Sequence, residues 1–147
     1  MSKSTLRSVA PCDCLAIRQA ARQITQLYDR YLLREDLRVG QYSILRKLSR
    51  FESLSINEMA LTMVMDATSI SRAIKPLVRD GLISVSAGRD ARSRKLELTE
   101  AGRAKLKSAT VLWQRAQNEF EAAFGPDNAE QVRHTMWRVV ESFKTSE

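Results

Sequence analysis

Cysteine, histidine and glycine are scarce in this chain. Its 147 residues include two cysteines, one histidine and five glycines. Cys12 and Cys14 stand almost side by side, so they do not provide the framework of a disulfide-stapled fold. With His134 as the only imidazole, one chain does not supply a tetrahedral zinc site without added carboxylates. The sequence therefore predicts no metal site.

Motifs of catalysis and of membrane insertion are also missing. The sequence contains no glycine-rich phosphate loop and no nucleophile elbow, so we expect neither an enzyme nor a bound cofactor. No apolar run approaches the ~18 residues of a membrane span, and the N-terminal segment lacks the apolar region of a signal peptide. We therefore expect a cytoplasmic protein without membrane contact.

Positive charge is in excess. The chain has 24 lysines and arginines against 17 aspartates and glutamates, a net charge of +7. This excess favours a polyanionic partner, nucleic acid first, because lysine and arginine release counterions when they neutralise phosphates. Four cations lie close together in one basic segment: Arg89, Arg92, Arg94 and Lys95. That segment is either a solvated loop or part of a binding site. The secondary structure predicted on either side of it distinguishes these two interpretations.

Apolar residues recur at intervals of three and four, the period of a buried helix face. The pattern predicts a long first helix over residues 12–36 and a second over Val39–Arg50. Ser55 followed by Glu58 forms a capping box, which predicts the start of a short third helix.

A fourth helix is predicted directly after the third. Asp66 caps its start and Gly81 suits its end, while Pro76 predicts a kink or a final turn. Four apolar residues are expected to face inward: Ile70, Ile74, Leu77 and Val78.

The basic segment lies between two strands of alternating character. The apolar residues of that alternation are Ile83, Val85, Leu96 and Leu98. Their period of two predicts a β-hairpin with one buried face. Thr99 then caps a long helix, and Asp127 with Glu130 predicts a capped start of the last one.

Two short helices in tandem followed by a hairpin form a winged helix-turn-helix. The fold class is therefore mostly α with a small β-hairpin wing, and the winged module covers residues 39–98. In such a module the second tandem helix enters the major groove of DNA, and the hairpin reaches the adjacent backbone or minor groove.

The residues that form this module resemble those of bacterial MarR-type (multiple-antibiotic-resistance) regulators. The most specific pieces are "RDGLI" at Arg79–Ile83, the pair Asp90 and Arg92, and "LTEAG" at Leu98–Gly102. The resemblance covers nearly the whole chain and implies one domain, residues 1–147, with dimerisation helices at 12–36 and 99–145. It implies a homodimer that binds a pseudo-palindromic operator in double-stranded DNA as a regulator, most often a repressor.

The apolar stripes of the flanking helices support a dimer, because a partner's matching helices would cover them. The alternative is a three-helix core within one chain.

DNA contacts are expected from two groups of residues. On the fourth helix these lie opposite the apolar stripe or at its margins: Thr68, Ser69, Ser71, Arg72, Lys75 and Arg79. In the wing they are Arg89, Asp90, Arg92, Arg94 and Lys95. The resemblance implies that Asp90 braces Arg92 in the minor groove, where an arginine senses groove width. The alternative for the hydroxyls is that they cap the helix or face water.

The signal that such a regulator senses is open. The resemblance implies a small-molecule effector between the dimerisation helices and the winged module, where candidate lining residues are Arg18, Tyr28, Tyr42 and Trp113. These aromatic residues have core packing as their alternative role. Cys12 and Cys14 resemble the reactive thiols of the oxidant-sensing branch of the family, near the start of the first helix. A winged helix that binds protein instead of DNA is the alternative from a different class.

Overall fold

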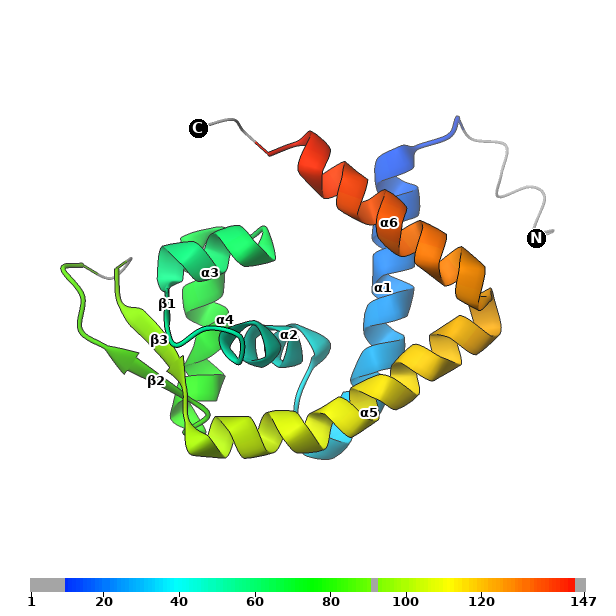
Figure 1. The fold of residues 1–147 in the computed structure, drawn as a ribbon. Helices are drawn as coiled ribbons and strands as arrows, with labels where there is room; N and C mark the ends of the chain where they lie inside the picture. Colours follow the sequence, from blue (N-terminus) through cyan, green and yellow to red (C-terminus); the bar gives the residue numbers. More distant parts are fainter. Residues whose placement is uncertain (1–9, 91–92, 145–147) are drawn as a thin grey trace.

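The computed structural model describes residues 10–90 and 93–144. A winged module lies at one side of the molecule, and helix α5 extends from it to a second region where α6 returns toward α1 (Figure 1). The winged module consists of α2 (Val39–Leu48), β1 (Leu54–Ser55), α3 (Ile56–Met63), α4 (Ala67–Arg79), β2 (Ile83–Ser86) and β3 (Lys95–Leu98). The remaining elements are α1 (Asp13–Leu32), the 3-10 turn η2 (Leu33–Glu35), α5 (Glu100–Phe124) and α6 (Pro126–Ser142). The predicted fold class is confirmed.

Helix starts follow the local chemistry of the sequence. The Ser55 hydroxyl accepts a hydrogen bond from the Glu58 backbone N–H, and the Glu58 carboxylate accepts one from Ser55 N–H, which completes the predicted capping box. Asp66 accepts from Ser69 N–H at the start of α4. Thr99 accepts from Gly102 N–H at the start of α5. These side chains satisfy backbone donors that have no partner within the helix.

The sheet contains one strand more than the predicted hairpin. β3 lies between β2 and β1, and both pairings are antiparallel. Leu54 of β1 stands opposite Leu96 of β3, and Ile83 of β2 stands opposite Leu98. A strand as short as β1 has no period of its own, so the sequence pattern did not reveal it.

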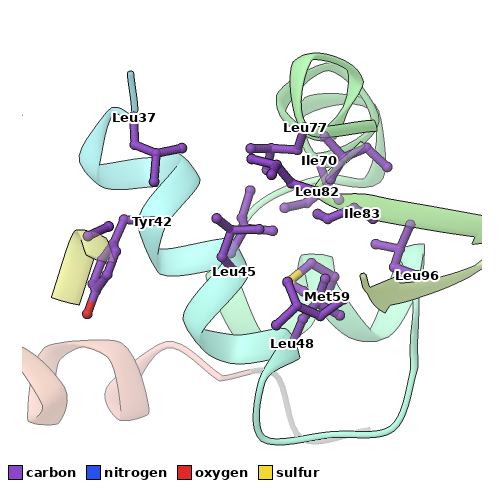
Figure 2. Close-up of a cluster of buried hydrophobic side chains, with 14 of the residues drawn as sticks. Leu37, Tyr42, Leu45, Leu48, Met59, Ile70, Leu77, Leu82, Ile83 and Leu96 are labelled. Atoms are coloured by element: carbon purple, nitrogen blue, oxygen red, sulfur yellow. The ribbon is translucent and has the colours of Figure 1, made fainter. Parts of the chain in front are cut away.

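The core of the winged module is an apolar cluster between the helices and the sheet (Figure 2). Leu45 of α2 faces Ile70 and Leu77 of α4, Leu48 of α2 lies beside Met59 of α3, and Leu96 closes the cluster from the sheet side. The sheet and the two tandem helices therefore share one core, which fixes the wing relative to α4.

Three expectations about individual residues were wrong. Val78 and Val85 are each 37% exposed. Val78 lies beside the buried stripe of α4, and Val85 lies on β2 at the outer edge of the sheet, opposite the buried Leu96 of the central strand β3. Asp127 does not cap α6, because that helix begins at Pro126 and its N-cap is Gly125, with φ +97°. Proline is favoured in the first helical turn, where its missing N–H costs nothing.

The end of α4 follows the prediction at Gly81. This residue has φ +73°, a left-handed conformation that glycine adopts without strain. Pro76 lies inside the last turn of α4, and the helix continues past it to Arg79.

Candidate nucleic-acid interface

Helix α4 presents a polar face opposite its buried stripe. Ile70, Ile74 and Leu77 are buried, whereas four of the predicted contact residues are exposed: Thr68, Arg72, Lys75 and Arg79. Ser69 and Ser71 are half-buried at the margins of the face. The amphipathic pattern therefore places cations and a hydroxyl on one accessible side of the helix.

The hydroxyl of Ser69 takes part in the N-terminal cap of α4. It donates to Asp66 Oδ2 at 2.8 Å, while the Ser69 backbone N–H donates to Asp66 Oδ1 at 2.7 Å. These backbone and side-chain hydrogen bonds hold the pKa of the Asp66 carboxyl below its ordinary value. The charged carboxylate stabilises the helix start.

Arg79 pairs with its neighbour at the other end of the helix. Its Nε lies 3.2 Å from Asp80 Oδ1, and both side chains are more than half exposed. An exposed pair of this kind contributes little to stability, so the guanidinium can exchange this partner for a phosphate.

The wing brings further cations to the same module. Arg89, Arg94 and Lys95 are exposed on the segment that joins β2 to β3 and on β3 itself. Arg92 was also predicted as a contact, and it lies outside the described residues. Asp90, predicted to brace Arg92, is exposed.

Asp90 and Ser93 hold the wing together through reciprocal hydrogen bonds. The Ser93 N–H donates to Asp90 Oδ1 at 3.0 Å, and the Asp90 N–H donates to Ser93 Oγ at 3.1 Å. Gly88 approaches Ser93 so closely that a Cβ on Gly88 would lie 2.5 Å from the Ser93 carbonyl carbon. An Asp followed by Ser three positions later is a known turn pattern, and it was the available signal for this role of Ser93.

The base of the wing is tied to the start of α3. Ile56 N–H donates to the Arg94 carbonyl at 3.1 Å, next to the β1–β3 pairing. The backbone at Arg94 and Lys95 therefore keeps a defined position relative to the tandem helices. Sequence periodicity gave no sign of this contact, because it joins residues far apart in the chain.

An apolar groove runs between α1, α5 and α6, and its lining includes Val39 at the start of α2. Its volume is about 700 Å³. The groove is lined by Ala16, Ile17, Ala20, Ala21, Ile24, Thr25, Tyr28, Val39, Gln117, Phe120, Ala129, Val132, Arg133 and Met136. On α6 only Ala129 is buried among the described residues, whereas Val132 is 40% exposed. The apolar stripe predicted for the last helix thus remains uncovered within one chain.

Tyr28 is the effector candidate that lines this groove. Its hydroxyl donates a hydrogen bond to Gln117 of α5, and burial raises its pKa above the ordinary value. Arg18 is exposed on α1 and is not among the groove residues.

Tyr42 and Trp113, the other two effector candidates, pack against each other between α2 and α5. Their ring centroids are 6.1 Å apart, and the Tyr42 hydroxyl lies 3.1 Å from Thr110 Oγ1. The Arg46 guanidinium stands over the Trp113 ring at 4.3 Å, a cation–π contact. This aromatic cluster joins the winged module to the long helix.

The two cysteines lie at the start of α1. Cys12 is the N-cap, and its Sγ accepts a hydrogen bond from Leu15 N–H at 3.4 Å. Both thiols are free and exposed.

Among residues 10–90 and 93–144, no three His, Cys, Asp or Glu side chains gather closely enough to hold a metal ion. In that same part of the chain, no helix combines the length and apolar character needed to cross a membrane.

Comparisons with known proteins point to one family. A family model described as "MarR family" matches residues 37–93. The crystal structure of the M. tuberculosis transcriptional regulator MosR is 34% identical over 89% of this chain and 94% of that chain, with a TM-score of 0.76. The same regulator in complex with DNA is 34% identical over 92% of this chain and 100% of that chain, with the same TM-score.

A more distant neighbour has the same fold. Bordetella bronchiseptica BpsR is 16% identical over 88% of this chain and 93% of that chain, with a TM-score of 0.76. Its DNA binding is described as regulated by 6-hydroxynicotinic acid. No curated protein matches this chain.

Proposed function

The chain belongs to the MarR family, and from this premise we propose that it is a transcriptional repressor that binds a pseudo-palindromic operator as a homodimer. The observation that supports this most is the joint presentation of cations by α4 and the wing on one core. Family membership also supports a role without enzymatic activity.

Recognition by α4 rests on its exposed face. Arg72 is the best side chain there for bidentate contact with guanine or for a phosphate clamp, since its guanidinium offers a planar fork of donors. Lys75 and Arg79 add phosphate contacts, and the Thr68 hydroxyl can donate to a phosphate or a base edge. Ser69 and Ser71 then lie at the margins of the interface.

Recognition by the wing rests on its basic residues. Arg92, outside the described residues, is proposed to enter the minor groove with Asp90 as its brace. Arg89, Arg94 and Lys95 are exposed on the same wing and would neutralise phosphates. The bonds between Asp90 and Ser93 support a wing of fixed shape, which lowers the entropy lost on binding.

The homodimer is proposed to form through the groove of α1, α5 and α6. Leu15 and Ile17 of α1 are 50% and 40% exposed, and Met136 of α6 is 36% exposed. A second copy that lays its own α1 and α6 against this face would bury these residues symmetrically. Two copies of α4 would then contact half-sites about one helical turn of DNA apart.

An effector is proposed for the end of the groove where Tyr28 and Val39 lie, because this end adjoins the winged module. A molecule there would change the position of the winged module relative to the arm, the name we give to α1, α5 and α6 together, and DNA affinity would change with it. The regulation described for BpsR is consistent with such a mechanism in a protein of the same fold.

Oxidant sensing is a second candidate, favoured by the place of Cys12. Cys12 caps α1 and both thiols are exposed to an oxidant, and Cys14 is close enough in sequence to act as a resolving thiol. If peroxide treatment leaves DNA binding unchanged, this candidate is excluded.

The proposed function is tested by selecting bound fragments of the source genome with the purified full chain, followed by footprinting. We expect a two-fold symmetric footprint and an affinity that falls steeply with salt. A footprint on one half-site would contradict the symmetric dimer. The absence of any salt-dependent duplex binding would favour a module that binds protein.

A further inference from the structure

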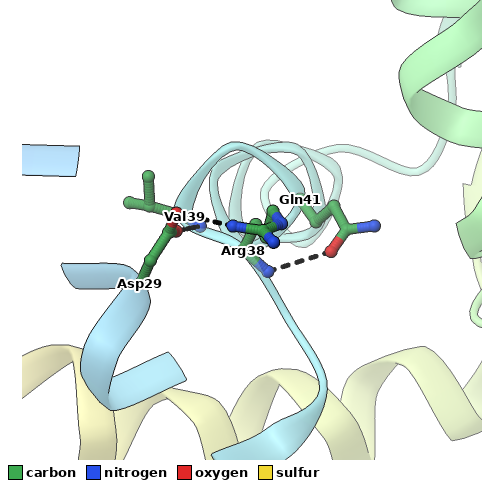
Figure 3. Close-up of polar contacts among 4 residues, drawn as sticks. All are labelled: Asp29, Arg38, Val39 and Gln41. Carbon is green, nitrogen blue, oxygen red and sulfur yellow. Dashed lines mark hydrogen bonds and ion pairs between the residues drawn. The ribbon is translucent and has the colours of Figure 1, made fainter. Parts of the chain in front are cut away.

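The start of α2 is held by a side chain from α1. Asp29 Oδ1 accepts a hydrogen bond from the Val39 backbone N–H at 2.7 Å, and Asp29 Oδ2 accepts one from Arg38 Nη1 at 3.3 Å (Figure 3). The Asp29 side chain is 13% exposed, so its bond to the Val39 N–H is partly buried, whereas the Arg38 side chain is 69% exposed and its bond to Asp29 faces water.

This contact replaces the cap that α2 lacks locally. The N-cap residue of α2 is Arg38, whose side chain has only donors and no acceptor for the free backbone N–H groups. Gln41 Oε1 accepts from the Arg38 N–H at 2.9 Å, and Asp29 serves the Val39 N–H. A negative side chain at this position also interacts favourably with the helix dipole.

Helix α2 in turn connects the arm to the DNA-reading elements. Leu45 and Leu48 pack into the core of α4 and the sheet. On another side, Tyr42 stacks on Trp113 of α5. A change in the orientation of α1 would therefore move the winged module through the contact at the start of α2.

We propose that Asp29 is a positioning residue for DNA recognition, which fixes the winged module on the arm and so sets the distance between the two α4 helices of the dimer. This inference rests on the proposed function, because the distance has meaning only in a dimer on DNA. Asp29 need not touch DNA, and its effect is on geometry. The groove is lined by Val39, the donor of this bond, and by Tyr28, the neighbour of Asp29 in the chain, so an effector at that end of the groove would act on the same joint.

The test measures how strongly binding depends on the spacing of the two half-sites. Full chains are titrated with duplexes that contain the selected operator, with its spacer shortened or lengthened by one or two base pairs, and with a duplex that keeps one half-site only. We expect wild-type affinity to fall about tenfold or more with a two-base-pair change, because a fixed dimer cannot follow the half-sites around the helix.

Asp29→Ala should weaken binding to the correct spacing by about fivefold and reduce the spacing penalty to less than about threefold, because a looser joint loses preorganisation. Its affinity for the single half-site should stay at the wild-type level. Asp29→Asn keeps an acceptor oxygen toward the Val39 N–H and should restore the wild-type dependence on spacing.

Val39→Pro breaks the same hydrogen bond from the other side and keeps Asp29. Val39 is the first residue of α2, where proline is favoured, and Arg38 has the extended backbone that precedes proline well. This variant should therefore fold and should show the same reduced dependence on spacing as Asp29→Ala.

Ser55→Ala is the matched control, since it removes a helix cap inside the winged module without touching the joint. It should lower stability and leave the spacing dependence unchanged. If Val39→Pro and Asp29→Ala both keep the wild-type dependence, or if Ser55→Ala relaxes it equally, the inference is overturned. If the wild type binds no duplex, or binds without dependence on spacing, the proposed function fails instead.

Discussion

The hydroxyl of Thr99 donates a hydrogen bond to the carbonyl oxygen of Gly81 at 2.6 Å. Thr99 is the N-cap of α5, and Gly81 follows the end of α4. The Thr99 backbone N–H also donates to the Leu82 carbonyl at 3.1 Å. The two motifs that resemble the family, "RDGLI" and "LTEAG", therefore meet where α4 ends and α5 begins.

Replacement of Thr99 should loosen this junction. Thr99→Ala removes the cap of α5 and the bond to Gly81, so the free energy of unfolding should fall by about 1 to 2 kcal/mol. Denaturant titration measures the change. Thr99→Ser keeps the hydroxyl and should lose much less, and equal losses in the two variants would show that the hydroxyl is not the cause.

A side chain at position 102 should be poorly tolerated. A Cβ on Gly102 would lie 2.1 Å from the Leu82 carbonyl oxygen, a backbone atom that cannot move without disturbing the junction. Gly102→Ala should therefore cost about 2 to 3 kcal/mol of stability. Gly40→Ala is the control, because nothing lies within 4 Å of its added Cβ, and it should raise stability by up to about 1 kcal/mol through helix propensity. An unaffected melting temperature in Gly102→Ala would contradict the close approach.

The cap of α4 should be sensitive to acid. Because hydrogen bonds from Ser69 hold the pKa of Asp66 below its ordinary value of 3.8 in the folded protein, the charged carboxylate stabilises the fold above that value. This contribution is lost as the pH falls through the lower, folded-state pKa. Asp66→Asn does not titrate, so the stability of the wild type relative to this variant should decline between about pH 5 and about pH 2. A constant difference over that interval would contradict the prediction.

Loss of a wing or helix arginine should weaken DNA binding without unfolding the protein. Arg92→Ala should reduce operator affinity by about tenfold or more, and Arg72→Ala should cost about 1 to 3 kcal/mol and relax the preference at one base position. Fluorescence anisotropy at several salt concentrations measures both effects, and thermal unfolding should be nearly unchanged. Arg138→Ala, an exposed cation on α6, is the control. Unchanged operator affinity in Arg92→Ala would count against the role of the wing.

A charge in the groove should separate the proposed dimer. Met136→Glu places a carboxylate among apolar residues that a second copy would cover, so sedimentation at micromolar concentration should change from dimer to monomer. Operator affinity should fall at the same time. Thr135→Glu adds the same charge on the neighbouring, exposed position outside the groove lining and should stay dimeric. A wild-type protein that sediments as a monomer would contradict the dimer itself.

Local chemistry made much of this fold predictable. Ser55, Asp66 and Thr99 mark helix starts because their side chains bond to backbone atoms a few residues away, and such contacts are visible in the sequence. The buried face of α4 followed from its period, except at Val78, whose position beside the stripe depends on how α4 is rotated against its neighbours.

Contacts between distant parts of the chain were not predictable in this way. The hydrogen bond from the Val39 N–H to Asp29 joins α2 to α1, and the bond from the Ile56 N–H to the Arg94 carbonyl joins a residue before α4 in the chain to one after it. No periodicity reports such pairs. For the candidate site, the sequence identified basic residues of α4 and the wing that are exposed in the structure, while the side-chain bond of Ser69 to Asp66 and the bonds between Ser93 and Asp90 are local contacts whose spacing of three residues the sequence analysis did not use.

The length of α5 has a consequence for any signal that reaches the arm. With 25 residues in one unbroken helix, α5 is about 37 Å long at 1.5 Å per residue. A rotation of about 5° at its Phe124 end would displace its Thr99 end by about 3 Å, close to the ~3.4 Å rise of one base pair. Because α5 is long and unbroken, a rotation of a few degrees at its Phe124 end would shift the winged module by about the rise of one base pair relative to DNA.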